Sequence, residues 1–259
     1  MSAALRTQIA HLARRSVLRT LRQPANVVPP LVFPLVLLAV NTGGLASATS
    51  LPGFPSDSFL DFFLAFTFMQ GAVFATMNGG TDLARDIQTG FLNRLALTPM
   101  RGVALLAGQL AGAVVMGLIQ SLVYLAVGLA AGASFEAGAG GALVLLALAV
   151  LIATGFGAVG AVLALRSGSG EAVQGMFPLL FALLFLSSMN LPRHLIEIDW
   201  FRTVATYNPV SYLIEALRSL IIQGWDGQAL ALGFGFAVAI IVVGLAGAAG
   251  ALRTRLVRT

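Results

Sequence analysis

The sequence contains no cysteine and no lysine. Without cysteine, the chain forms neither a structural disulfide nor a thiolate metal site, whatever its compartment. All 15 basic residues are arginines, whereas the phosphate loop of a conventional ATPase needs a lysine to reach the β- and γ-phosphates. The chain is therefore not its own conventional ATPase.

Charged and histidine side chains are scarce. Only 10% of the residues are charged, and no acidic residue lies in the middle of an apolar run, which argues against an intramembrane protease and a proton-coupled carrier. The two histidines, His11 and His194, fall on opposite sides of the membrane in the topology derived below, so they cannot share a zinc ion. We therefore expect neither a catalytic residue nor a metal site in this chain.

Long uncharged runs dominate the remaining sequence. Hydrophobic residues make up 58% of the 259 residues, and the mean hydropathy is +0.92. In lipid, backbone groups must find hydrogen bonds within their own segment, and the runs lack strict alternation, so each predicts an α-helix. We predict an all-α polytopic membrane protein, a single domain over residues 1–259, with six spans within residues 26–251: Asn26–Ala46, Phe62–Thr81, Val103–Ala131, Ala137–Leu165, Ala172–Leu191 and Gln228–Ala251.

The arginines indicate how the spans are oriented. With both termini in the cytoplasm, twelve arginines lie on the inner side and three on the outer side, a strong positive-inside bias. The inner set is Arg6, Arg14, Arg15, Arg19, Arg22, Arg85, Arg94, Arg101, Arg166, Arg253, Arg255 and Arg258, and the outer set is Arg193, Arg202 and Arg218. We therefore expect a multi-pass protein of the plasma or inner membrane with cytoplasmic termini. Because these arginines flank spans and have no interleaved aromatics, we expect them to contact anionic lipid rather than nucleic acid.

The first apolar run ends in Ala46-Ser47-Ala48, which resembles a signal-peptidase site. The basic region before that run is far longer than that of a signal peptide, which favours an uncleaved first span. Within residues 1–24, Leu5, Ile9 and Leu12 share one side of a helical wheel. This pattern predicts a helix on the inner membrane surface, and the alternative is a basic flank with no further role.

Two other segments lie outside the spans. The loop between the second and third spans is charged and amphipathic, is interrupted by Gly90 and closes at Pro99. It is either a docking element for a cytosolic partner or a solvated connector. The segment 191–227 is too charged to span and too apolar for a free loop, so we expect helices that dip into or lie on the outer leaflet. Asn208-Pro209 predicts a helix start there, and Glu215 and Arg218 lie one turn apart, where they can pair.

Phenylalanines gather in two of the predicted spans. Three of them in the fifth span repeat every fourth residue and so form one stripe along a helix, and others lie in or beside the second span. Aromatic side chains of this kind line a route for a flat lipophilic molecule or a cation, or they simply face lipid. The candidate pathway residues are Phe62, Phe66, Gln70, Phe74, Phe177, Phe181 and Phe185. Separately, Gly108 and Gly112, like Gly128 and Gly132, have a spacing that favours close helix packing within the chain.

Two connected stretches resemble a known family. The first carries Asp86, Gly90, Arg94 and Thr98-Pro99-Met100-Arg101, and the second reads LPRHLIEIDWFRTVATYNPVSYLIEALRSL, from Leu191 to Leu220. Together they resemble the type-2 permease family of ATP-binding-cassette (ABC) exporters, in particular the daunorubicin-resistance drug-efflux permeases. The likeness covers nearly the whole chain and includes the N-terminal surface helix and the six spans.

The resemblance implies an exporter subunit without its own ATPase site. A second permease half would associate with this chain, and separate ATPase subunits would carry the ATP and Mg²⁺, so that this chain holds no cofactor. A coupling helix over residues 90–101 would contact the ATPase, and the implied coupling residues are Asp86, Gly90, Phe91, Leu92, Arg94, Leu95, Pro99 and Arg101. The implied outer gate contains Asn208, Pro209, Tyr212, Glu215 and Arg218.

We therefore expect an exporter of lipophilic drugs or natural products. The alternatives are an exporter of polysaccharide or lipid with the same architecture, an ion-coupled carrier or channel, and a membrane scaffold without transport activity.

Overall fold

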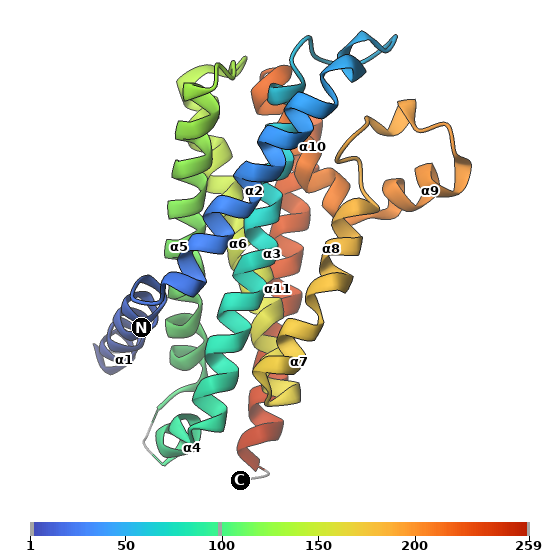
Figure 1. Ribbon diagram of the computed structural model, residues 1–259. Coiled ribbons are helices and arrows are strands. Elements are labelled where there is room, and N and C mark those ends of the chain that lie inside the picture. Colours follow the sequence, from blue (N-terminus) through green and yellow to red (C-terminus); the bar gives the residue numbers. More distant parts are fainter. Residues whose placement is uncertain (1–2, 98–99, 258–259) are drawn as a thin grey trace.

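The computed structural model describes residues 3–97 and 100–257, and within these ranges all regular secondary structure is helical. Five helices are long and apolar enough to cross a membrane, and Gly170–Phe185 forms a shorter apolar segment. The long helices run side by side as a bundle (Figure 1). This arrangement confirms the predicted all-α polytopic membrane fold.

The long helices follow the predicted spans closely. They are α2 (Pro24–Gly44), α3 (Phe59–Gln88), α5 (Gly102–Ala130), α6 (Gly138–Ser167) and α11 (Gly227–Val257). The remaining helices are α1 (Ala3–Leu21), η1 (Ala46–Ser50), α4 (Phe91–Ala96), α7 (Gly170–Gly175), α8 (Phe177–Phe185), η2 (Arg193–Leu195), α9 (Asp199–Tyr207) and α10 (Pro209–Ile222).

The fifth predicted span, Ala172–Leu191, is not one continuous helix. It consists of α7 and α8, which meet at Met176, and α8 ends at Phe185. Pro178 lies in the first turn of α8, where its missing N–H and its ring prevent the preceding helix from continuing unbroken. The residues that follow α8 form turns instead of a last helical turn.

Helix α3 lies at the centre of the bundle and packs against α2, α5, α6 and α10. Glycines bring α3 and α6 into backbone contact, because a Cβ atom on Gly160 would overlap the carbonyl oxygen of Thr76 and lie 3.1 Å from the Gly80 nitrogen. The Thr76 hydroxyl donates a hydrogen bond to the Phe156 carbonyl at 2.9 Å. This close contact fixes α6 against α3, the most buried of the five long helices.

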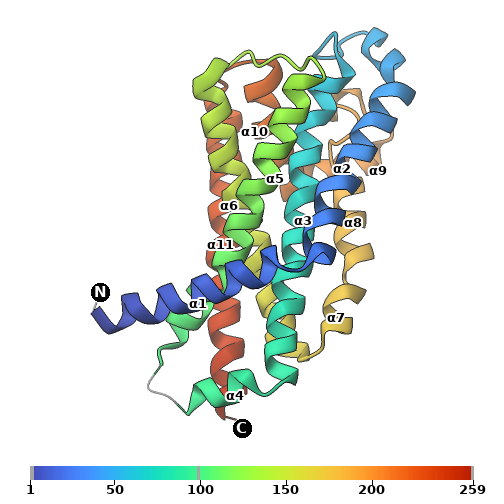
Figure 2. The same ribbon diagram turned by 60° about the vertical axis from the view of Figure 1, so that its left-hand side comes forward.

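Helix α1 runs across the bundle at a steep angle to the long helices (Figure 2). It crosses α5 at Gly108 and Gly112, where any Cβ would overlap side-chain atoms of Leu12 and Ser16. The Ser16 hydroxyl also donates to the Gln109 carbonyl at 3.0 Å. The first glycine pair therefore serves the crossing of α1 over α5.

Helices η2 and α9 project sideways from the bundle, whereas α10 returns and packs against α3, α6 and α11 (Figure 1). Helix α10 begins where the sequence predicts, because the Asn208 side chain accepts a hydrogen bond from the Val210 N–H at 2.9 Å and Pro209 occupies the first turn. Asn208 also donates to the carbonyls of Leu183 and Leu186. It thus ties the start of α10 to the end of α8.

Candidate coupling and substrate sites

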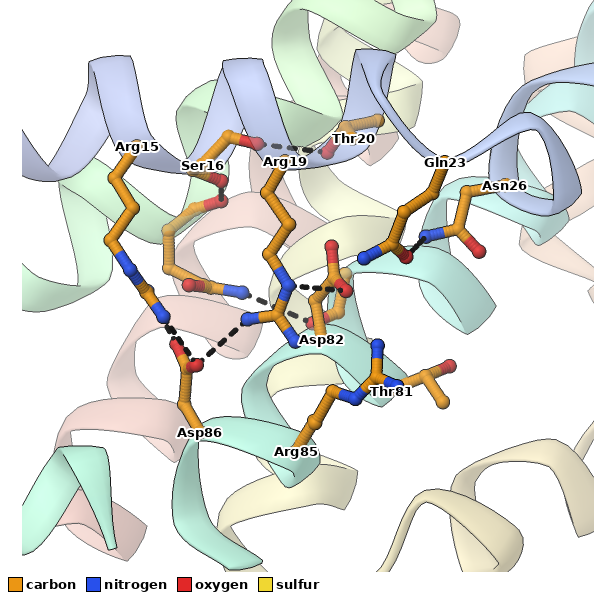
Figure 3. A network of polar contacts seen from close by, with 12 residues as sticks. Arg15, Ser16, Arg19, Thr20, Gln23, Asn26, Thr81, Asp82, Arg85 and Asp86 are labelled. Atoms are coloured by element: carbon orange, nitrogen blue, oxygen red, sulfur yellow. Dashed lines mark hydrogen bonds and ion pairs between the residues drawn. The ribbon is translucent and has the colours of Figure 1, made fainter. Parts of the chain in front are cut away.

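An ion-pair cluster joins α1 to α3 near the end of the bundle that carries α4. Arg15 binds Asp86 with two hydrogen bonds of 2.7 Å each. Arg19 donates to Asp86 at 2.7 Å and lies 3.2 Å from Asp82. Figure 3 shows both arginines extending from α1 toward the two aspartates of α3. We call these four residues the α1–α3 cluster.

The α1–α3 cluster arises from helical spacing and burial together. Arg15 and Arg19 are four residues apart on α1, as Asp82 and Asp86 are on α3, so each pair faces one side of its helix. Asp86 is only 5% exposed and Asp82 only 6% exposed, and carboxylates at that depth are stable only when paired. The hydrogen bonds with Asp86 also raise the pKa of the Arg15 guanidinium above its ordinary value.

Helix α4 follows α3 after a sharp turn. Gly90 has φ +69°, a left-handed conformation that glycine adopts without strain. The Arg15 guanidinium lies 3.9 Å from the centre of the Phe91 ring, and Leu92 packs into the core beside Leu83. The α1–α3 cluster therefore also contacts α4.

The other face of α4 is open. Arg94 is exposed, and Leu97, directly after the helix, is 87% exposed, more than any other large hydrophobic side chain in the described ranges. Leu95 is partly buried, and Arg101 is exposed just before α5. Of the predicted coupling residues, only Pro99 lies outside the described residues.

Five phenylalanines from three helices form a continuous row, which we call the aromatic ladder. Within α8, the ring centres of Phe177 and Phe181 are 5.0 Å apart and those of Phe181 and Phe185 are 5.5 Å apart. Phe74 of α3 lies 5.7 Å from Phe177, and Phe33 of α2 lies 5.9 Å from Phe181. Phe33 is 40% exposed and Phe185 is 49% exposed, so the ladder lies on the surface of this chain.

The remaining candidate pathway residues lie elsewhere. Phe62 and Phe66 are buried in the aromatic core beside Phe63. Gln70 is fully buried, and its amide has no hydrogen-bond partner within the described part of the chain. Gln120 on α5 is also buried, and its amide likewise has no hydrogen-bond partner within the described residues. The structure thus brings four of the seven candidates together in the aromatic ladder and separates the other three from it.

Arg218 of α10 is almost completely buried, and it binds carbonyl oxygens. Its Nε donates to the Phe62 carbonyl at 3.1 Å, and its Nη2 donates to the Ser188 and Met189 carbonyls at 3.0 Å each. The guanidinium also lies 3.6 Å from the centre of the Phe62 ring. Arg218 therefore holds the turn after α8 and the start of α3 against α10.

Glu215 forms its ion pair with Arg193 at 2.5 Å, not with Arg218 as the helical spacing predicts. It also accepts a hydrogen bond from the Ser188 hydroxyl at 2.9 Å. Tyr212 lies beneath Arg193, with 4.5 Å from the guanidinium carbon to the ring centre, and stacks on Phe236. Glu215 pairs with Arg193, which lies outside α10, because the Arg218 guanidinium already donates its hydrogen bonds to carbonyl groups. Three of the five predicted gate residues, Tyr212, Glu215 and Arg218, are thus linked to one another through Arg193 and Ser188.

Sequence reasoning missed the partners in both polar groups. It counted Arg15 among the inner arginines but did not pair it with Asp86, and it did not single out Asp82, Arg19 or Phe33 as site residues. The matching four-residue spacings on the two helices were a usable signal for the α1–α3 cluster. No local sequence pattern indicates that Phe33 belongs to the aromatic ladder, because the rings that it contacts lie on two other helices.

Together, the spans, the buried ion pairs and the surface aromatic row define a polytopic helical membrane protein with a short helical loop tied to its N-terminal helix. The chain belongs to the ABC-2 type transporter family, whose model matches residues 7–222. It is therefore the membrane subunit of an ABC transporter, in a family of permease subunits that lack the ATPase site and work with ABC ATPase subunits. This membership confirms the resemblance seen in the sequence.

Individual relatives agree with this assignment. The chain is 30% identical over 198 residues to the daunorubicin resistance ABC transporter permease protein DrrB1 of Streptomyces coeruleorubidus, covering 75% of this chain and 66% of that protein. It is 24% identical over 213 residues to the probable doxorubicin resistance permease DrrC of Mycobacterium tuberculosis, covering 81% and 75%. It is 26% identical over 218 residues to the putative transport permease ycf38 of Porphyra purpurea, covering 82% and 72%.

Proposed function

We propose that this chain exports lipophilic drugs or natural products across the cell membrane, powered by separate ATPase subunits. The observation that carries the proposal is the aromatic ladder, a continuous row of rings on the surface of α2, α3 and α8. Flat apolar molecules stack on such rings with about 0.5–1.5 kcal/mol per pair beyond burial. Two of the relatives are named for resistance to daunorubicin and to doxorubicin.

A second permease half completes the pathway in this proposal. The aromatic ladder is half-exposed along the bundle, so a second copy or a related chain placed against α2 and α8 would enclose it between two halves. Alternating exposure of the enclosed surface then carries the substrate across. The buried group around Arg218 closes the pathway on the outer side, because it holds the turn after α8 against α3.

The ATPase contacts α4 in this proposal. Arg94 and Leu97 offer it a charged and an apolar contact, while Leu92 anchors the helix to the bundle from the opposite side. ATP and Mg²⁺ bind on the ATPase subunits. Movement of α4 then passes to α1 and α3 through Phe91 and the α1–α3 cluster.

The orientation follows from the positive-inside rule, with both termini and α4 in the cytosol and η1 outside. Because the chain has no cysteine, the labelling of a single introduced cysteine shows on which side of the membrane its position lies. A membrane-impermeant maleimide is expected to label Ser47→Cys in intact cells and Gln88→Cys only after permeabilisation, since both positions are exposed. The reverse pattern would refute the orientation.

The export proposal is tested with the chain co-expressed with its candidate ATPase. We expect the two to copurify and daunorubicin to stimulate ATP hydrolysis in lipid. Phe181→Ala is expected to weaken that stimulation severalfold, whereas Leu179→Ala, on the same helix and 62% exposed, leaves it unchanged. Stimulation by a lipid or polysaccharide instead of the drug would assign the substrate to that class. Absence of any associated ATPase would refute the proposal.

A further inference from the structure

A groove of about 750 Å³ lies between α6 and α11, at the end of the bundle where α4 and the C-terminus are found. Leu165, Arg166 and Ser167 from the last turn of α6 form one side of it. The other side is formed by six residues of α11: Ala246, Gly247, Gly250, Ala251, Thr254 and Arg255. The groove is separate from both the α1–α3 cluster and the aromatic ladder.

The polar end of the groove is basic. Arg166 is exposed at its edge, and Arg255 lies opposite, with its Nη1 donating to the Leu165 carbonyl at 2.8 Å. The guanidinium of Arg255 lies so close to Gly168 that a Cβ there would be 2.6 Å from its Nη2. None of the described residues that line the groove is acidic, so two cationic groups face it together with the hydroxyl-bearing residues Ser167 and Thr254.

The part of the groove along α11 is apolar and is lined by small residues. Gly247, Gly250 and Ala251 follow the spacing of one helix face, and Thr254 continues it into the polar end, so that the four extend about 10 Å along α11 at 1.5 Å per residue. A Cβ on Gly250 would meet no atom within 4 Å. The groove therefore runs from a basic rim at the end of the spans into their apolar part, with space left by the missing side chains.

We propose that this groove binds an anionic phospholipid. Arg166 and Arg255 would contact its phosphate, and one acyl chain would lie on the glycine face of α11. Basic pockets between spans recognise anionic headgroups in this way. The combination of two arginines with an apolar channel along the bilayer normal fits a lipid, because a lipid would contact both the arginines and the glycine face, whereas a soluble anion would contact only the arginines. The site is independent of the exported substrate.

Binding is measured on the purified chain in neutral detergent, by fluorescence titration with labelled phosphatidylglycerol and by the rise in melting temperature. We expect saturable binding and stabilisation by phosphatidylglycerol, and neither effect from phosphatidylcholine. Inorganic phosphate is expected to give no stabilisation. Equal stabilisation by inorganic phosphate would overturn the proposal in favour of a free-anion site.

Four variants separate the groove from a diffuse basic surface. Arg166→Gln is expected to weaken phosphatidylglycerol binding about fivefold, roughly the contribution of one arginine near an anionic lipid, and Arg166→Lys to retain most of it. Gly250→Leu, which fills open space without changing charge, is expected to weaken binding at least about fivefold by displacing the acyl chain. Arg253→Gln, exposed on the same helix but outside the groove, serves as the matched control with unchanged affinity. Equal losses in Arg253→Gln and Arg166→Gln, or normal binding by Gly250→Leu, would refute the site.

Discussion

Asp86 is the residue on which the connection between α1 and α3 depends most. It accepts two hydrogen bonds from Arg15 and one from Arg19, each at 2.7 Å. Asp86→Ala removes all three and leaves the Arg19 side chain, 16% exposed, facing Asp82 alone. Hydrogen bonds to charged groups contribute about 1.5–3 kcal/mol when buried. Exposed ion pairs contribute about 1 kcal/mol or less.

These figures give an order for three substitutions. The Arg15 side chain is 37% exposed, so solvent screens its part and Arg15→Ala should cost about 1 kcal/mol. Arg19→Ala should cost about 2 kcal/mol, because it leaves two carboxylates with one partner. Asp86→Ala should cost about 3 kcal/mol, since it removes the shared acceptor.

The assay is the free energy of unfolding in mixed micelles, with the ATPase activity of the assembled complex measured in parallel. In a double-mutant cycle, Arg19→Ala in the Asp86→Ala background should cost about 1 kcal/mol less than in the wild-type chain. Substrate-stimulated ATP hydrolysis should fall severalfold in Asp86→Ala while the ATPase subunits still copurify. The reasoning would be refuted if the effects of Arg19→Ala and Asp86→Ala on the free energy of unfolding were additive. It would also be refuted if Arg15→Ala lowered that free energy more than Asp86→Ala.

Four further predictions concern single positions. Arg94→Glu should lower stimulated ATP hydrolysis severalfold without changing insertion, because Arg94 faces outward from α4; normal coupling in a well-inserted variant would remove its role. Gly160→Ala should lower stability by about 2 kcal/mol in thermal melts because its Cβ overlaps α3 backbone, whereas Gly235→Ala, in open space, should stabilise by up to about 1 kcal/mol; similar melting temperatures for the two would contradict the packing argument. Gln70→Leu should raise stability by about 1 kcal/mol, since it removes buried polar atoms without partners; a lower melting temperature would reveal a bound water or substrate there. Arg218→Lys should cost about 2 kcal/mol despite keeping the charge, because an ammonium cannot replace the planar donors that reach three carbonyls; wild-type stability would show that charge alone suffices.

Local chemistry made several elements predictable. The spans are visible because charge-free runs of about 20 residues have no other stable environment than lipid. The start of α10 is visible because Asn208 and Pro209 act within one turn of each other. By contrast, the break between α7 and α8 was not predicted. Pro178 indicates such a break, but the segment is apolar on both sides of it, so hydropathy alone shows one continuous run.

Pairings between distant residues were not predictable in the same way. The spacing of Glu215 and Arg218 favours a pair within α10, yet Glu215 binds Arg193 and Arg218 binds carbonyl groups. Helical spacing describes only neighbours on one helix, whereas the turn after α8 supplies competing acceptors. The phenylalanine stripe of α8 was visible, but its contact with Phe33 depends on how α2 and α8 pack around α3.

The environment, the helical class and the approximate ends of the spans can be predicted from the amino-acid order, because hydropathy and arginine placement act residue by residue along the chain. Which charged groups meet and which aromatic side chains share a surface depends on how the helices pack. This packing brought residues 15 and 86 within hydrogen-bond distance through the crossing of α1 over α5. Such contacts depend on the relative placement of whole helices, which short-range patterns do not encode.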